Sequence, residues 1–224
     1  MRQPELFPTE KGHIGTDESG KGDYFGPLVV AGVFVPDDQR RVLIEIGVRD
    51  SKKISDNRVR ELADLIKQGY KHSVVAIGPL KYNELYEKLR NLNRILAWAH
   101  SRAIENILDE IRCSLVITDQ FGDQSYVRNA LMKKGRNIEL IQKHKAEEDL
   151  AVAAASILAR AGFLRRLYFL SQEIGLDLPK GSSPLAEEAG VKLVNLQGKE
   201  ILAKVAKKHF KLTQRIIDSA GSHG

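Results

Sequence analysis

Apolar and polar positions follow two different periods along the chain, and together they predict an α/β protein. Apolar residues recur at every third or fourth position over residues 92–111, as on the buried face of a helix. Residues 55–69 predict a second helix, which Ser55 or Asp56 would open. Short apolar runs predict strands at residues 12–17, 28–35, 72–78, 114–118 and 138–142.

These strands and helices alternate along the chain, and a glycine-rich loop joins the first two strands. Trp98 and His100 lie within the helix predicted at residues 92–111, and we interpret both as packing or surface residues. The sequence contains no internal repeat, low-complexity tract or convincing linker.

The composition is typical of one large domain with an ample core, because 42% of the 224 residues are apolar. The single cysteine, Cys113, excludes an internal disulfide, fits a reducing compartment and is expected in the core. No apolar run reaches the roughly 18 residues of a membrane span, and no signal-peptide core is present. We therefore expect a soluble, cytoplasmic protein that binds no membrane.

Positive charge is concentrated in two parts of the chain. The formal net charge is +6, and cations gather at residues 128–145, with one acid, and at residues 199–215, where six cations accompany Glu200. Each run alone is typical of a solvated helix face. Beside a metal site, both runs favour contacts with a phosphate backbone, and we select Lys207 and Lys208 for such contacts.

An adjacent pair of acids, Asp17 and Glu18, closes the first predicted strand. Successive strand side chains point to opposite faces, unless the glycines that follow bend the chain here. Two neighbouring carboxylates raise each other's pKa unless a cation neutralises them, and a divalent metal does so most directly. A helix N-cap is the competing interpretation of a bare Asp-Glu pair, because Asp and Ser both cap helices well.

The loop after this pair contains Gly20, Lys21 and Gly22. Glycine tolerates positive φ and lets a ligand approach the backbone closely, and the lysine adds a positive charge. Surface turns often use the same residues. Next to paired acids, however, the loop favours a bound phosphate or sugar.

Asp119 follows the apolar strand predicted at residues 114–118. An Asp in this place is commonly a turn or cap residue. The carboxyl ends of neighbouring strands, however, are where α/β sheets gather functional groups. If this strand lies beside the first one, Asp17, Glu18 and Asp119 meet at one edge of the sheet.

Three acids, Glu147, Glu148 and Asp149, precede an alanine-rich run at residues 151–159. Acids in the first turn of a helix interact favourably with its dipole, which explains them without any further role. The small side chains would also let this helix approach the sheet closely. Its N-terminus would then reach the edge that carries the other carboxylates.

The sequence at residues 15–27, Gly-Thr-Asp-Glu-Ser-Gly-Lys-Gly-Asp-Tyr-Phe-Gly-Pro, closely resembles the active-site signature of the type 2 ribonucleases H. Its last five residues and the Asp-Gln-Phe at residues 119–121 resemble the ribonuclease HIII branch. The Lys-Ala-Glu at residues 145–147, followed by Ala-Ala-Ser-Ile at residues 154–157, is similar to another motif of the family. The resemblance extends over residues 13–215.

This resemblance implies a ribonuclease H-like α/β fold, with a mixed sheet of about five strands flanked by helices and a helical C-terminal extension. It also implies endonucleolytic hydrolysis of the RNA strand of RNA/DNA hybrids, leaving 5′-phosphate and 3′-hydroxyl ends. Two Mg²⁺ or Mn²⁺ ions would be held by Asp17, Glu18, Asp119 and Glu147. Substrate would be bound by Gly20, Lys21, Gly22, Ser51 and Lys52, together with Lys207 and Lys208.

The resemblance places the catalytic domain at residues 13–218, between a short tail at residues 1–12 and a frayed tail at residues 219–224. Ribonuclease HIII usually has a separate N-terminal substrate-binding domain, which twelve residues cannot hold. No obligate protein partner is implied.

Two alternatives remain open. A ribonuclease HII-like enzyme would incise at single ribonucleotides in DNA; this branch usually has Asp in place of Glu147 and a stacking tyrosine near Gly181-Ser182. A non-catalytic hybrid-binding module is disfavoured, because four acids at an anion-binding site would repel phosphate unless metal were present. A metal-dependent cleavage assay separates these alternatives from the main prediction.

Overall fold

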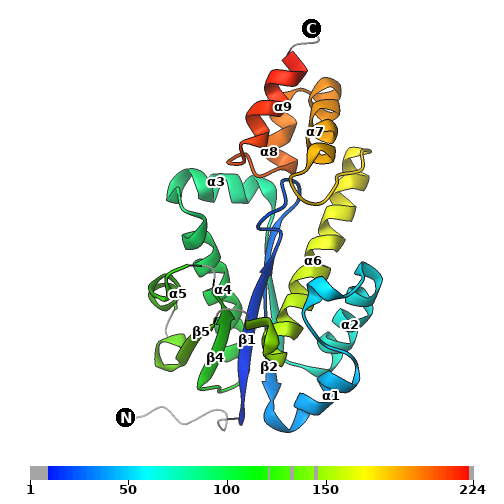
Figure 1. The fold of residues 1–224 in the computed structure, drawn as a ribbon. Helices are drawn as coiled ribbons and strands as arrows, with labels where there is room; N and C mark the ends of the chain where they lie inside the picture. The colour runs from blue at the N-terminus through cyan, green and yellow to red at the C-terminus, as the bar shows by residue number, and fades with distance from the viewer. Residues whose placement is uncertain (1–9, 121, 132–133, 144–145, 222–224) are drawn as a thin grey trace. The chain divides into compact units, whose positions relative to one another are not determined.

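The structure, a computed structural model, describes residues 10–120, 122–131, 134–143 and 146–221 (Figure 1). Its centre is a five-stranded mixed sheet with the strand order β3-β2-β1-β4-β5. All five predicted strands are confirmed, with ends displaced by two residues or fewer. The strands are β1 (Gly12–Ser19), β2 (Leu28–Pro36), β3 (His72–Ile77), β4 (Leu115–Asp119) and β5 (Glu139–Lys143).

The helix predicted at residues 55–69 is confirmed, and the Ser55 hydroxyl caps it by accepting a hydrogen bond from the amide of Arg58 at 3.3 Å. The helix predicted at residues 92–111 is also confirmed and ends at Leu108. The α-helices are α1 (Arg40–Glu45), α2 (Asp56–Gly69), α3 (Pro79–Leu89), α4 (Leu92–Leu108), α5 (Gln124–Ala130), α6 (Leu150–Ile174), α7 (Pro184–Gln197), α8 (Leu202–Val205) and α9 (Leu212–Gly221). None of the helices within the described ranges is long and apolar enough to cross a membrane.

The chain divides into two compact units, and each unit is built from three separate segments of the sequence. The first unit contains residues 1–18, 30–75 and 93–161, and the second contains the remaining three segments, 19–29, 76–92 and 162–224. The predicted tails fall largely outside the described residues, so the predicted domain boundaries stay a prediction.

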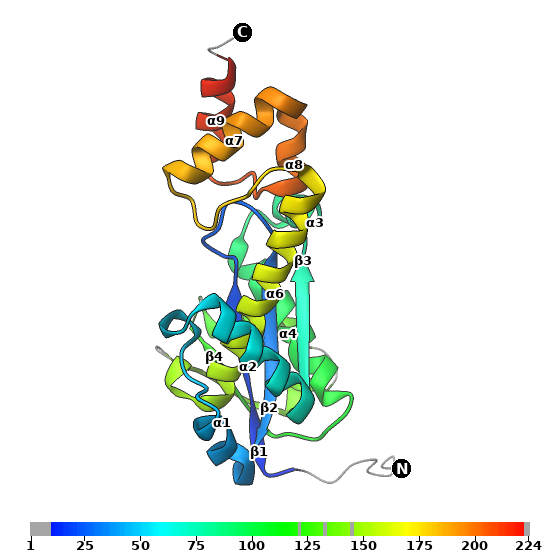
Figure 2. The ribbon, with the colours of Figure 1, turned by 90° about the vertical axis from the view of Figure 1, so that its right-hand side faces the viewer.

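In the first unit, helices cover both faces of the sheet, with α4 on one face and the first part of α6 on the other (Figures 1 and 2). A Cβ atom at Gly15 of β1 would lie only 2.1 Å from the carbonyl carbon of Ala151 in α6. The α6 backbone therefore touches the β1 backbone, as the alanine-rich run predicts. On the opposite face, Gly32 of β2 packs against Ala103 and Ile107 of α4.

In the second unit, the loop between β1 and β2 is tied to the segment at the end of α8. Phe25 forms an antiparallel bridge with Ala206, and the Gly26 amide donates a hydrogen bond to the carbonyl of Val205 at 2.9 Å. Gly20 has φ +88°, and a Cβ atom there would meet the carbonyl oxygen of Pro27 at 2.2 Å. Only glycine fits at the start of this loop.

Candidate active site

The two acids of the first motif lie on opposite faces of β1, because the strand continues without a bend to Ser19. Thr16 of β1 is paired with Thr118 of the parallel strand β4. The next residues along the two strands, Asp17 and Asp119, therefore lie side by side on the same face, toward α6. Glu18 lies on the other face, toward α4. Three carboxylates are thus gathered at the carboxyl ends of two neighbouring strands.

The surroundings of Asp17 shift the pKa of its carboxyl strongly. Burial raises the pKa of Asp17 well above its usual range, and the charges of Glu18 and Asp119 raise it further. The amide of Glu18, which donates to Asp17 Oδ1 at 2.8 Å, and the charge of Lys52 lower it only in part. In the absence of a cation, burial and the neighbouring acids therefore favour the protonated form of Asp17.

Asp119 is the last residue of β4, and its side chain anchors the segment before α6. The amide of Ala146 donates a hydrogen bond to Asp119 Oδ1 at 3.2 Å. Ala146 opens a single 3₁₀ turn, Ala146–Glu148, so the backbone of Glu147 comes directly after the anchored amide. The side chain of Glu147, the predicted fourth ligand, is outside the described part of the structure.

Asp149, the last acid of the same segment, is held by structural hydrogen bonds. It accepts hydrogen bonds from the amides of Ala151 and Val152 at 2.9 and 3.2 Å, as an N-cap of α6. Nε2 of His13 lies 2.8 and 2.9 Å from its two carboxylate oxygens. Although burial opposes ionisation, His13 and the amides hold the pKa of Asp149 below its usual value.

His100 contacts the acidic site, a role that the sequence analysis missed. Its side chain is fully buried in α4, and Nε2 lies 3.3 Å from Oε2 of Glu18. Nδ1 lies 2.9 Å from the hydroxyl of Thr16 and 3.5 Å from that of Thr118. Because Nδ1 faces the two threonine hydroxyls, Nε2 is the ring nitrogen that faces the Glu18 carboxylate. His100 thereby orients Glu18 from behind.

We expect His100→Gln to weaken the apparent affinity for the activating metal by about tenfold or more, because Glu18 loses its fixed orientation. The measurement is a titration of cleavage rate against Mg²⁺ or Mn²⁺. Trp98→Ala is the control, since Trp98 lies on the same helix and is 45% exposed. Equal metal dependence in both variants would contradict an orienting role for His100.

The turn at residues 50–53 places one predicted substrate-binding residue near the acids and buries another. The Ser51 amide donates to the hydroxyl of Ser156 at 3.3 Å, and its carbonyl accepts from Arg160. Ser51 is largely buried and its backbone supports the turn, and its role in substrate binding stays a prediction. Lys52 is exposed, and its positive charge lowers the pKa of Asp17.

The prediction that Lys207 contacts phosphate is wrong. Its side chain is 0% exposed, and Nζ donates to the backbone carbonyls of Asp23 and Gly26 at 2.7 and 2.8 Å. The error has a physical reason. A run of cations in the sequence does not show which of its side chains are buried, because burial depends on tertiary packing. Lys208 is exposed, and its role as a phosphate contact stays a prediction.

The predicted basic surface at residues 128–145 is partly neutralised. Lys134 Nζ lies 2.5 Å from the carboxylate of Asp109. Lys133 and Lys145 are outside the described residues, whereas Arg128, Arg136 and Lys143 are exposed. In the other run, Arg215 forms an ion pair with Glu187 at 2.9 Å.

The donor set at the sheet edge fits a hard divalent cation. Carboxylate oxygens are the ligands that Mg²⁺ and Mn²⁺ prefer. Burial and the charges of Glu18 and Asp119 raise the pKa of Asp17, and a bound cation would favour its ionised form. In the described part of the chain, which lacks the Glu147 side chain, no three acid, histidine or cysteine side chains converge closely enough to hold a metal as they stand.

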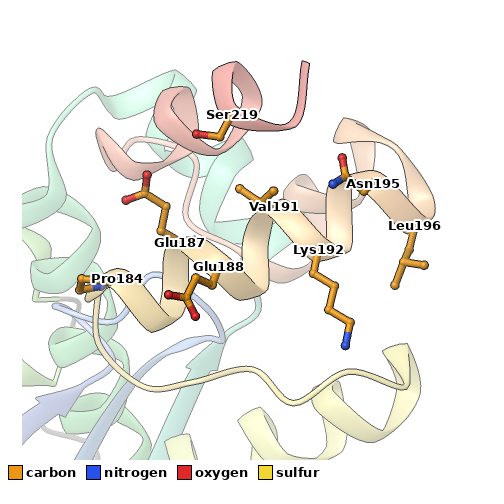
Figure 3. Close-up of a pocket in the computed structure, with 8 residues that line it drawn as sticks. All are labelled: Pro184, Glu187, Glu188, Val191, Lys192, Asn195, Leu196 and Ser219. Atoms are coloured by element: carbon orange, nitrogen blue, oxygen red, sulfur yellow. The ribbon is translucent and has the colours of Figure 1, made fainter. Parts of the chain in front are cut away.

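A surface groove of about 640 Å³ lies along α7 in the second unit, with Ser219 of α9 at its rim (Figure 3). Its charged lining consists of Glu187, Glu188 and Lys192, and Val191 and Leu196 supply apolar surface. None of the predicted site residues lines it. With two acids against one lysine, the groove does not favour a phosphate backbone.

The fold and the site together define a class of protein, the α/β proteins with an acidic centre at the carboxyl ends of the central strands. Residues 14–213 match the family model described as ribonuclease HII. A ribonuclease HIII of Protochlamydia amoebophila (strain UWE25) is 47% identical over 209 residues, covering 93% of this chain and 69% of that protein. One of Chlamydia felis (strain Fe/C-56) is 43% identical, with 93% and 71% covered.

Solved structures agree with these relatives. Bst-RNase HIII in complex with Mn²⁺ is similar with a TM-score of 0.88 at 31% identity, over 96% of this chain and 71% of that one. Aquifex aeolicus RNase H3 gives a TM-score of 0.74 at 34% identity, over 90% and 73%. The chain belongs to the type 2 ribonuclease H family, in its ribonuclease HIII branch, and it is an endoribonuclease.

Proposed function

We propose that this endoribonuclease hydrolyses the RNA strand of RNA/DNA hybrids, with divalent cations held by Asp17, Glu18, Asp119 and Glu147. The observation that carries the proposal is the gathering of the first three carboxylates at the ends of β1 and β4, in a chain of the ribonuclease H family. When bound there, two Mg²⁺ or Mn²⁺ ions supply an ionised water at neutral pH and neutralise charge on the reacting phosphate.

Residues of the protein position two of these carboxylates and influence the protonation of the third. The Ala146 amide fixes Asp119, and His100 orients Glu18, so two carboxylates are held before any cation arrives. Asp17 has to give up its proton to bind a cation, because burial and the neighbouring acids favour its protonated form. Metal affinity therefore rises with pH. Lys52 opposes that protonation by its charge.

The turn at Gly20, Lys21 and Gly22 follows Glu18 almost directly in the sequence, and we assign it to the ribose of the RNA strand. A Cβ atom at Gly22 would have no protein atom within 4 Å, so the backbone is open to a ligand at this point. The open backbone at Gly22, next to the half-buried Lys21, can contact the 2′-hydroxyl, which distinguishes RNA from DNA. Exposed lysines such as Lys208 would contact phosphates without reading the sequence.

Product mapping on an RNA/DNA hybrid labelled at the RNA 5′ end tests this function. We expect internal cuts in the RNA strand with Mg²⁺ or Mn²⁺ and none in EDTA. Attack of water on phosphorus, with departure of the 3′ oxygen, leaves 5′-phosphate and 3′-hydroxyl ends. Ends that carry a 2′,3′-cyclic phosphate, or cleavage that persists in EDTA, would contradict the proposal.

A further inference from the structure

Lys207 is the only buried lysine in the part of the chain that the structure describes, and its ammonium lies against the loop between β1 and β2. Nζ donates to the carbonyls of Asp23 at 2.7 Å and Gly26 at 2.8 Å, and it lies 3.5 Å from the carbonyl of Phe25. Three carbonyls of one short loop thus converge on a single side chain. The ring of Tyr82 lies 5.9 Å from the same nitrogen.

An ammonium in this place is energetically unfavourable. Burial lowers the pKa of Lys207 to about 7, and the nearby charge of Asp23 opposes this only in part. The Asp23 carboxylate itself accepts a hydrogen bond from the amide of Gly181 at 2.6 Å. An apolar side chain would fill the space without desolvating a charge, but it would leave the loop carbonyls without donors. The hydrogen bonds to these carbonyls therefore explain why a lysine, and not an apolar residue, occupies this buried position.

The backbone around Lys207 reinforces this contact. The Lys207 amide donates to the carbonyl of Tyr24 at 2.9 Å, so backbone and side chain of one residue hold adjacent parts of the loop. The Asp23 amide in turn lies 3.4 Å from the carbonyl of Gly20 and closes the turn that contains Lys21 and Gly22. A shift of the Asp23 carbonyl would consequently move that turn.

We propose that Lys207 is a positioning residue, which fixes the turn at residues 20–23 through the carbonyls of Asp23 and Gly26. The inference rests on the proposed function, in which that turn contacts the ribose 2′-hydroxyl. Because its side chain is fully buried, Lys207 acts through the loop and not by direct contact with substrate. It limits the conformations of the loop, so that the open backbone at Gly22 is presented in one arrangement.

Two variants separate a donor role from simple space filling. Lys207→Met keeps the length and apolar stem but removes every donor, whereas Lys207→Gln is shorter and keeps an amide donor. If the donors matter, Met is the more harmful substitution, and if only packed volume matters, Gln is. Lys192→Met, at an exposed lysine of α7, is the matched control.

The first measurement is hydrogen–deuterium exchange of the amides at residues 19–26, in the metal-free protein. We expect Lys207→Met to speed exchange there by about tenfold or more, Lys207→Gln by less, and Lys192→Met not at all. The second is the cleavage ratio between a hybrid and the same hybrid with one 2′-deoxy residue at a cut site. We expect this ratio to fall by about fivefold in Lys207→Met, which a mere loss of stability would not cause.

The two arms distinguish the possible failures. If wild-type protein shows no ribose preference, or Gly22→Ala cleaves hybrids normally, the assignment of the turn to the ribose fails, and the exchange measurement still judges Lys207. If both Lys207 variants keep wild-type exchange and ribose preference, the positioning role is overturned; it is also overturned if Gln is more harmful than Met. Should Lys207→Met not fold, Lys207→Gln is compared with Lys192→Met on the same two measurements.

Discussion

Asp17→Asn is expected to lower the rate of hybrid cleavage by about a thousandfold or more, because it removes a proposed metal ligand of the acidic site. In EDTA the same substitution should raise the melting temperature by about 2–4 °C. The carboxyl of Asp17 is half-buried and lies beside Glu18 and Asp119, so ionising it is unfavourable in the folded protein. The amide keeps the shape of the side chain and removes that charge.

The pH dependence of stability follows from the sign of this shift. The pKa of Asp17 is raised in the folded protein, so the unfolded chain loses this proton at lower pH than the folded chain does. The contribution of Asp17 to metal-free stability therefore decreases as pH rises from its unfolded pKa through its folded pKa. The gain from Asp17→Asn should be largest at neutral and alkaline pH and should vanish in acid, where both states are protonated.

Two controls accompany this measurement. Adding Mg²⁺ or Mn²⁺ should raise the melting temperature of the wild-type protein but not of Asp17→Asn, since binding to the folded state stabilises it. Glu148→Gln, at an exposed acid close to the site in sequence, should retain cleavage within about threefold. Cleavage by Asp17→Asn within the same threefold range would exclude Asp17 as a metal ligand.

The sequence predicts the elements whose pattern is local and strong. The continuous apolar run of β2 and the regular spacing of apolar residues in α4 determine those elements almost independently of the rest of the chain. Helix α3 was not predicted, because its apolar period is weak, and its clearest local signal is Pro79 at the first helical position.

Site residues are predictable only where a motif carries them. Asp17, Glu18 and Asp119 end two apolar strands, and the register of those strands brings them together. His100 has no ligand spacing in the sequence, since its contact with Glu18 arises from the packing of α4 on the sheet. Lys207 looks like its exposed neighbour Lys208 in a charge run, and only the tertiary structure distinguishes them.

Substrate choice should differ by about a hundredfold between two duplexes, one with a run of four or more ribonucleotides and one with a single ribonucleotide in DNA. Holding a lone ribonucleotide requires recognition of the RNA to DNA junction. In the ribonuclease HII pattern, a stacking tyrosine near residue 182 does this, and here that residue is Ser182, which cannot stack. If the turn at residues 20–22 contacts 2′-hydroxyls, as proposed, those contacts add up over neighbouring ribonucleotides.

Residue 182 lies next to the β1–β2 loop, which contains the turn proposed to contact the ribose. Gly181 donates to the Asp23 carboxylate at 2.6 Å and accepts from the Tyr24 amide at 2.9 Å, so the exposed Ser182 directly follows a residue bound to the β1–β2 loop. The measurement is single-turnover cleavage of both duplexes with the same labelled strand length and metal. Comparable rates on the two duplexes would favour a ribonuclease HII-like or dual activity. Ser182→Tyr tests whether an aromatic ring at this position adds junction cutting while hybrid cleavage is retained, as stacking on the base next to the junction predicts.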